Sequence, residues 1–211
     1  MPVTLANLIP FILASALLLV IPGPTIVMVV SQAIAHGRRV ALASVLGVGL
    51  GDLVAASLSL TGVGTLLAAS ATGFAVLKTL GAAYLVFIGV KMWRAPLPDF
   101  AAIDAAPLSG TGRKVFRDSF LVTVFNPKGI VFFMAFVPQF ITPAHAFAPQ
   151  AAMLVATFVL LGIVNAYCYM RVADRARLAI RRPRVLRTTT RFGAGLLMTA
   201  GVAALFARRA A

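Results

Sequence analysis

Residues 5–30 read LANLIPFILASALLLVIPGPTIVMVV and contain no Asp, Glu, Lys or Arg. A helix needs about 20 apolar residues to cross the hydrocarbon core of a bilayer, so this stretch is long enough to span a membrane. Proline lacks a backbone N–H and clashes with the carbonyl four residues before it, and Pro22-Gly23-Pro24 lies within the stretch. We therefore expect a retained transmembrane helix that is broken at these three residues.

The rest of the chain has the same apolar character. Of its 211 residues, 61% are hydrophobic and 11% are charged, whereas a soluble domain is about 45–50% apolar and about 25% charged. Residues 53–77 and 129–170 also contain no Asp, Glu, Lys or Arg. A bilayer cannot hydrogen-bond exposed backbone groups, which excludes an open sheet. The sequence predicts an all-α membrane protein in which residues 1–211 form a single transmembrane domain.

The apolar segments predict six transmembrane helices, separated by short polar or Gly- and Pro-containing breaks. They cover about residues 5–30, 40–67, 74–92, 118–141, 150–170 and 189–207. The fourth segment carries a second helix-breaking motif, Asn126-Pro127-Lys128-Gly129. Because three helices separate the two motifs, they enter the membrane from opposite sides, as in a 3+3 inverted-topology repeat. The alternative is that both motifs are ordinary proline kinks.

The basic residues are concentrated in particular loops. The chain has 19 Lys and Arg against 5 Asp, and most basic residues follow the first, third and fifth predicted helices. Such an excess marks the cytoplasmic side of a membrane protein, so both termini are expected on the opposite side. Arg208 and Arg209 depart from this pattern. The charge distribution explains the basic character without a nucleic-acid partner.

Three charged residues fall inside predicted helices: Asp52, Lys78 and Lys128. Each costs about 2.5–3.5 kcal/mol at the centre of a membrane helix, and such residues usually pair or face a wet cavity. Counting 1.5 Å per helical residue from the nearest cytoplasmic cation places all three roughly 16–20 Å from the inner face. We expect Asp52 to pair with one of the lysines. The pair either takes part in transport, with Asp52 exchanging protons or binding a substrate ammonium, or only locks helices together.

Other patterns limit the alternatives. The closely spaced Gly47, Gly49 and Gly51 predict positions where helices pack tightly. One cysteine is too few for a redox pair, and the sequence contains no catalytic set or metal motif. We therefore expect a protein that is not an enzyme and has no cofactor and no resident metal. The remaining classes are a small-solute or metal-ion exporter, a membrane redox protein and a non-transporting scaffold or receptor.

Several different short motifs follow one another along the chain. They are Ile21-Pro22-Gly23-Pro24, Gly37-Arg38-Arg39, Gly47-x-Gly49-x-Gly51-Asp52, Lys78-x-x-Gly81-Ala82-Ala83-Tyr84-Leu85 with Gly89, Phe116-Arg117, and Asn126-Pro127-Lys128-Gly129 followed by Phe136-x-Pro138-Gln139-Phe140. In this order and spacing the sequence resembles the LysE/RhtB family of bacterial amino-acid exporters, over about residues 10–170.

The resemblance implies a six-helix exporter in the bacterial inner membrane that moves amino acids or close derivatives outward, driven by a proton or cation gradient. The residues at the family's motif positions are expected to bind substrate or couple its transport: Pro22, Gly23, Pro24, Asp52, Lys78, Asn126, Pro127 and Lys128. Two lysines and one carboxylate favour neutral, zwitterionic substrates over cationic ones. The expected partners are the amino acid and the lipid bilayer, and the sequence is compatible with a homo-oligomer.

Overall fold

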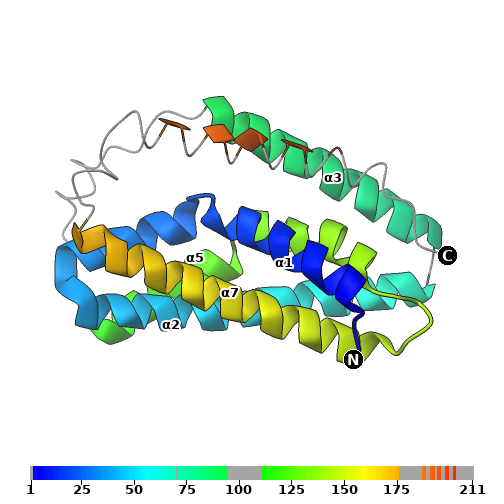
Figure 1. Cartoon of the computed structure of the whole chain (residues 1–211), viewed down its shortest axis with the longest axis horizontal. Helices are drawn as coiled ribbons and strands as arrows, with labels where there is room; N and C mark the ends of the chain where they lie inside the picture. The colour runs from blue at the N-terminus through cyan, green and yellow to red at the C-terminus, as the bar shows by residue number, and fades with distance from the viewer. Residues whose placement is uncertain are drawn as a thin grey trace.

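The computed structural model describes residues 2–69, 71–94 and 111–175, together with isolated positions between 187 and 202. All regular structure in these residues is helical (Figure 1). The elements are α1 (Leu5–Val20), α2 (Pro24–Ala69), α3 (Ala71–Arg94), α5 (Gly112–Val124), α6 (Pro127–Val131), the π-helix η1 (Phe132–Phe136), the 3₁₀-helix η2 (Val137–Phe140) and α7 (Phe147–Arg175). The expected all-α architecture is confirmed.

Both predicted helix breaks are present. α1 ends at Val20, residues 21–23 are not helical, and α2 starts at Pro24, so that α1 and Pro24–Ile34 are bent by 55°. The second break separates Gly112–Val124 from Pro127–Phe140, which are bent by 41°. A proline occupies the first position of the helix after each break, where its missing N–H costs no hydrogen bond.

A third change of direction lies inside α2, at Gly37, in the gap between the predicted helices 5–30 and 40–67. The φ of Gly37 is 74° and its ψ is 177°, so the backbone is in a left-handed region that a residue with a Cβ rarely adopts. The following segment, His36–Gly64, is long and apolar enough to cross a membrane. Gly37 therefore separates the first broken span from the second span.

Among the described residues, several helices are long and apolar enough to cross a membrane. His36–Gly64 and Phe147–Ala173 each qualify by length and composition, and each bent pair can form one further span. The predicted helix 74–92 lies within α3, whereas most of the predicted helix 189–207 lies outside the described residues. These apolar helices make the chain a multi-pass membrane protein.

Several helix ends differ from their predictions by a few residues, because hydropathy does not mark polar helical turns. α5 begins at Gly112, several residues before the expected start at 118, and its first two turns carry Arg113, Lys114 and Arg117. Residues 71–73, in the gap between the predicted helices 40–67 and 74–92, belong to α3, which begins at Ala71. Apolar length therefore located the helices better than their ends.

Two apolar clusters form the described core. The aromatic cluster joins α1, η1 and α7 through ring contacts, and its central rings are those of Phe11, Phe132, Phe133 and Phe158. Figure 1 shows α1 alongside α7 in this part of the bundle.

The aliphatic cluster joins both segments of α2 to the C-terminal part of α7. Its buried side chains include Val29, Val45, Val48 and Met170. Along α2, Asp52 lies between the two clusters. The described core is therefore divided into two apolar layers with a polar level between them.

Glycines let α2 pack closely against its neighbours, as expected. A Cβ at Gly47 would collide with the carbonyl oxygen of Phe116 in α5, and one at Gly51 would lie 2.7 Å from Thr123 Cβ. A Cβ at Gly49 would instead lie 2.7 Å from the Ile163 side chain of α7. These contacts set the distance of α2 from both α5 and α7, and thereby the position of Asp52 at the next residue after Gly51.

Candidate functional site

A small cavity lies where the two helix breaks meet. Its volume is about 30 Å³, which is room for a water molecule or two. Its polar lining residues come from α2, the Asn126 break, α6 and α7: Thr25, Asp52, Asn126, Lys128 and Asn165. The cavity is too small to hold a molecule the size of an amino acid.

Lys128 is fixed at the first turn of α6. The Asn126 side chain accepts a hydrogen bond from the backbone N–H of Lys128 at 3.1 Å and so caps the helix. The Lys128 side chain is buried, and its Nζ donates to the carbonyl oxygens of Leu18 at 2.9 Å and Ile21 at 3.0 Å. The last carbonyls of a helix have no partner within it and carry partial negative charge, so the end of α1 is a favourable place for this ammonium.

Asp52 lines the same cavity from the second segment of α2. Its Oδ2 atom is buried and has no hydrogen-bond partner among the described residues. The atom lies against the bare backbone of α7, since a Cβ at Gly162 would be only 2.5 Å from it. The structure thus brings Asp52 and Lys128 to one cavity, where Nζ of Lys128 donates to the carbonyls at the end of α1. The alternative pair of Asp52 with Lys78 lies outside the described residues.

The two breaks are joined directly. Nδ2 of Asn126 donates to Oγ1 of Thr25, the residue after Pro24, at 3.1 Å. A Cβ at Gly23 would lie 3.6 Å from Nζ of Lys128, so the first break also borders the ammonium. The predicted residues of both proline motifs therefore lie at one junction in the middle of the fold.

Lys78 cannot be placed in the site. Its backbone belongs to α3, which contacts α6 and η1, but its side chain lies outside the described part of the structure. Among the predicted ionisable residues, Asp52 and Lys128 are therefore the two that the structure brings together.

Three residues of α7 complete the site, and the sequence did not single them out. Gly162 gives Asp52 its space, Nδ2 of Asn165 donates to the Leu19 carbonyl at 3.0 Å, and the hydroxyl of Tyr169 donates to the Val20 carbonyl at 2.7 Å. A signal for Asn165 was present, because an amide side chain stands within the charge-free stretch 129–170. In such a helix a polar side chain usually bonds to a neighbouring helix.

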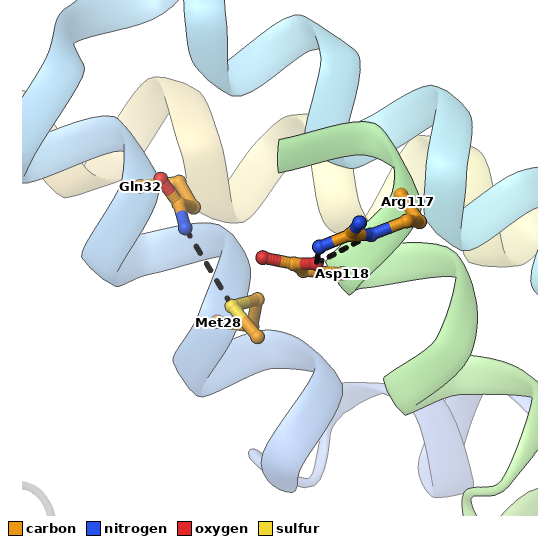
Figure 2. Close-up of polar contacts among 4 residues, drawn as sticks. All are labelled: Met28, Gln32, Arg117 and Asp118. Carbon is orange, nitrogen blue, oxygen red and sulfur yellow. Dashed lines mark hydrogen bonds and ion pairs between the residues drawn. The ribbon is translucent and has the colours of Figure 1, made fainter. Parts of the chain in front are cut away.

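A second group of polar side chains lies near the start of α5 and differs from the cavity in its charge balance. The Asp118 carboxylate forms an ion pair with the adjacent Arg117 at 3.0 Å (Figure 2). Figure 2 also shows Gln32 donating to Met28 Sδ at 3.7 Å on the facing segment of α2. Asp118 is thus neutralised locally, whereas Asp52 is not. Within the described residues, no three His, Cys, Asp or Glu side chains gather into a group that could hold a metal ion.

Comparison with known proteins identifies relatives over nearly the whole chain. The family model described as "LysE type translocator" matches residues 16–209. A homoserine/homoserine lactone efflux protein of Salmonella typhimurium is 33% identical over 202 residues, covering 95% of this chain and 96% of the relative. A leucine efflux protein of Klebsiella pneumoniae is 31% identical over 167 residues, covering 78% and 76% of the two chains. No solved structure matches significantly.

Proposed function

The chain belongs to the LysE family of translocators, and we propose that it exports neutral amino acids or close derivatives through the cavity at its two helix breaks. The observation that carries this proposal is the charge arrangement of the cavity. An unpartnered carboxylate oxygen of Asp52 and the ammonium of Lys128 line the same small space. Relatives named for homoserine and leucine efflux support the same substrate class.

The two side chains complement an amino-acid zwitterion. Asp52 would receive the substrate ammonium, and Lys128 would receive its carboxylate. A lysine ammonium has three N–H donors, and two of those of Lys128 are used by the α1 carbonyls. One donor remains for a carboxylate. A substrate with a cationic side chain would bring a second positive charge to a site that contains one carboxylate, which is unfavourable at low dielectric.

The position of the cavity between two apolar clusters supports alternating access. We propose that the aromatic cluster closes one side and the aliphatic cluster the other, and that opening either side rotates helices about the breaks. Two breaks that contact each other through Asn126 and Thr25 support a 3+3 inverted repeat with the substrate at its centre. We further propose coupling to a proton or cation gradient, and both termini on the outer side of the bacterial inner membrane.

Efflux from loaded liposomes tests the proposal. The purified protein is reconstituted, the vesicles are loaded with radiolabelled homoserine, leucine, lysine or glutamate, and release is compared with that from protein-free vesicles. Homoserine and leucine should leave faster than lysine and glutamate. Asp52→Asn and Lys128→Met should each reduce release at least about ten-fold, because a hydrogen bond to a charged group contributes about 1.5–3 kcal/mol.

Asp118→Asn is the matched control, because it removes the same charge from a carboxylate that pairs with the adjacent Arg117 in α5, outside the cavity. This variant should transport at the wild-type rate. Release of lysine alone would contradict the substrate class. Release of none of the four amino acids would contradict amino-acid export. Vesicles loaded with Zn²⁺ would then distinguish a metal-ion exporter, which releases the ion, from a non-transporting scaffold, which does not.

A further inference from the structure

We propose that Asn165 and Tyr169 of α7 are positioning residues for transport, which hold the broken end of α1 so that Lys128 keeps one N–H free for the carboxylate of the substrate. This inference rests on the proposed function and adds two residues from a helix that carries neither breaking motif. It follows from the way in which four consecutive backbone carbonyls are satisfied.

The carbonyls of residues 18–21 each accept a hydrogen bond from a side chain of another helix. Lys128 Nζ donates to the first and the last of them, Nδ2 of Asn165 donates to Leu19, and the hydroxyl of Tyr169 donates to Val20. These carbonyls lie at the end of a helix and therefore lack helical partners. Inside a bilayer they cannot turn to water instead, so the three side chains serve as a cap.

Of the four carbonyls, two accept from the charged Lys128 and two accept from neutral side chains. An amide and a phenol bind the two middle carbonyls, which leaves Lys128 with two carbonyl partners for three N–H groups. If either neutral donor were lost, its carbonyl would compete for the remaining N–H of the ammonium. Asn165 and Tyr169 thus determine how much hydrogen-bonding capacity Lys128 offers to the cavity.

Their positions differ in a useful way. Asn165 itself lines the cavity, so its replacement could also change a direct contact with the substrate. Tyr169 is one helical turn farther along α7, and its hydroxyl contacts the Val20 carbonyl. An effect of Tyr169→Phe on carboxylate recognition would therefore be transmitted through α1 and Lys128.

The test compares a substrate that has a carboxylate with one that lacks it. Reconstituted wild-type protein, Asn165→Leu and Tyr169→Phe are assayed for efflux of homoserine and of homoserine lactone, in which the carboxylate has become an ester. For each variant we expect the KM for homoserine to rise about five-fold or more, as for loss of one hydrogen bond to a charged group. The KM for the lactone should change less than about two-fold, because the lactone has no carboxylate to bind to Lys128.

Tyr167→Phe is the matched control, because Tyr167 lies on the same helix with a side chain that is 43% exposed. It should leave both KM values unchanged. If Asn165→Leu and Tyr169→Phe changed the KM for homoserine and the KM for the lactone by the same factor, or changed Vmax alone, these residues would be only structural. Either result would overturn the inference. A wild-type protein that releases neither substrate would instead contradict the proposed function.

Discussion

Replacing Asp52 by Asn should stop transport without weakening the fold, whereas replacing Lys128 by Met should weaken both. The two residues look equivalent in the sequence, since each is a charge within a membrane helix. Their contacts are different, because Lys128 Nζ donates to two α1 carbonyls and Oδ2 of Asp52 has no hydrogen-bond partner among the described residues. Stability and transport therefore separate a helix-locking role from a transport role.

The expected magnitudes follow from these contacts. Lys128→Met removes two charge-assisted hydrogen bonds, at about 1.5–3 kcal/mol each, but also removes a membrane-buried charge that costs about 2.5–3.5 kcal/mol. The net loss of unfolding free energy is then up to about 3.5 kcal/mol. Asp52→Asn breaks no hydrogen bond at Oδ2 and relieves a buried charge, although the attraction to Lys128 offsets part of that gain. Its unfolding free energy should equal or exceed that of the wild type.

Equilibrium unfolding of the purified protein in mixed detergent–SDS micelles measures these differences, with efflux assayed on the same preparations. Asp118→Asn provides the reference for removing a carboxylate outside the cavity. Breaking a buried ion pair on one side usually costs about 3–5 kcal/mol. A loss of that size for Asp52→Asn, with transport retained in the folded fraction, would refute the reasoning and assign Asp52 to the helix lock.

Two glycine substitutions test the packing that positions the site. Gly162→Ala would place a Cβ 2.5 Å from Asp52 Oδ2, so efflux should fall several-fold and the unfolding free energy by about 1–3 kcal/mol. Gly129 lines the same cavity, but a Cβ there meets nothing within 4 Å, so Gly129→Ala should change neither efflux nor stability. Equal losses in the two variants would contradict the steric argument. Gly47→Ala would collide with the α5 backbone and should lower the unfolding free energy by about 1–3 kcal/mol, whereas Gly62→Ala, with open space at its Cβ, should be neutral or stabilising by up to about 1 kcal/mol.

The sequence was sufficient for the features that depend on local chemistry. Two proline motifs predicted both helix breaks, and the gap between the first two predicted helices contains the change of direction at Gly37. Charge-free length predicted helices in a membrane. The shared depth of Asp52 and Lys128, obtained from the rise per residue, agrees with their place in one cavity.

The partners of these residues could not be predicted, because they depend on how helices pack. The expectation of an intramembrane ion pair considered only ionisable side chains, whereas the ammonium of Lys128 is bound by backbone carbonyls of α1. Those carbonyls are invisible in the sequence, since every residue has one. Asn165 was missed for the same reason: its role depends on lying opposite the end of a helix that is 146 positions away in the chain.

The break in α1 and the charge of Lys128 explain each other. A helix that ends inside a bilayer exposes carbonyls that no water can satisfy, and a lysine inside a bilayer needs acceptors that no lipid can provide. When the ammonium of Lys128 donates to these carbonyls, both sets of groups are hydrogen-bonded. The carbonyls carry no net charge, so the positive charge of Lys128 is solvated but not cancelled. A carboxylate in place of these carbonyls would have cancelled the charge of Lys128 and left no positive charge to attract an anion. Because Asp52 lines the same cavity with an unpartnered oxygen, the cavity keeps one charge of each sign available, which is what the proposed zwitterionic substrate requires.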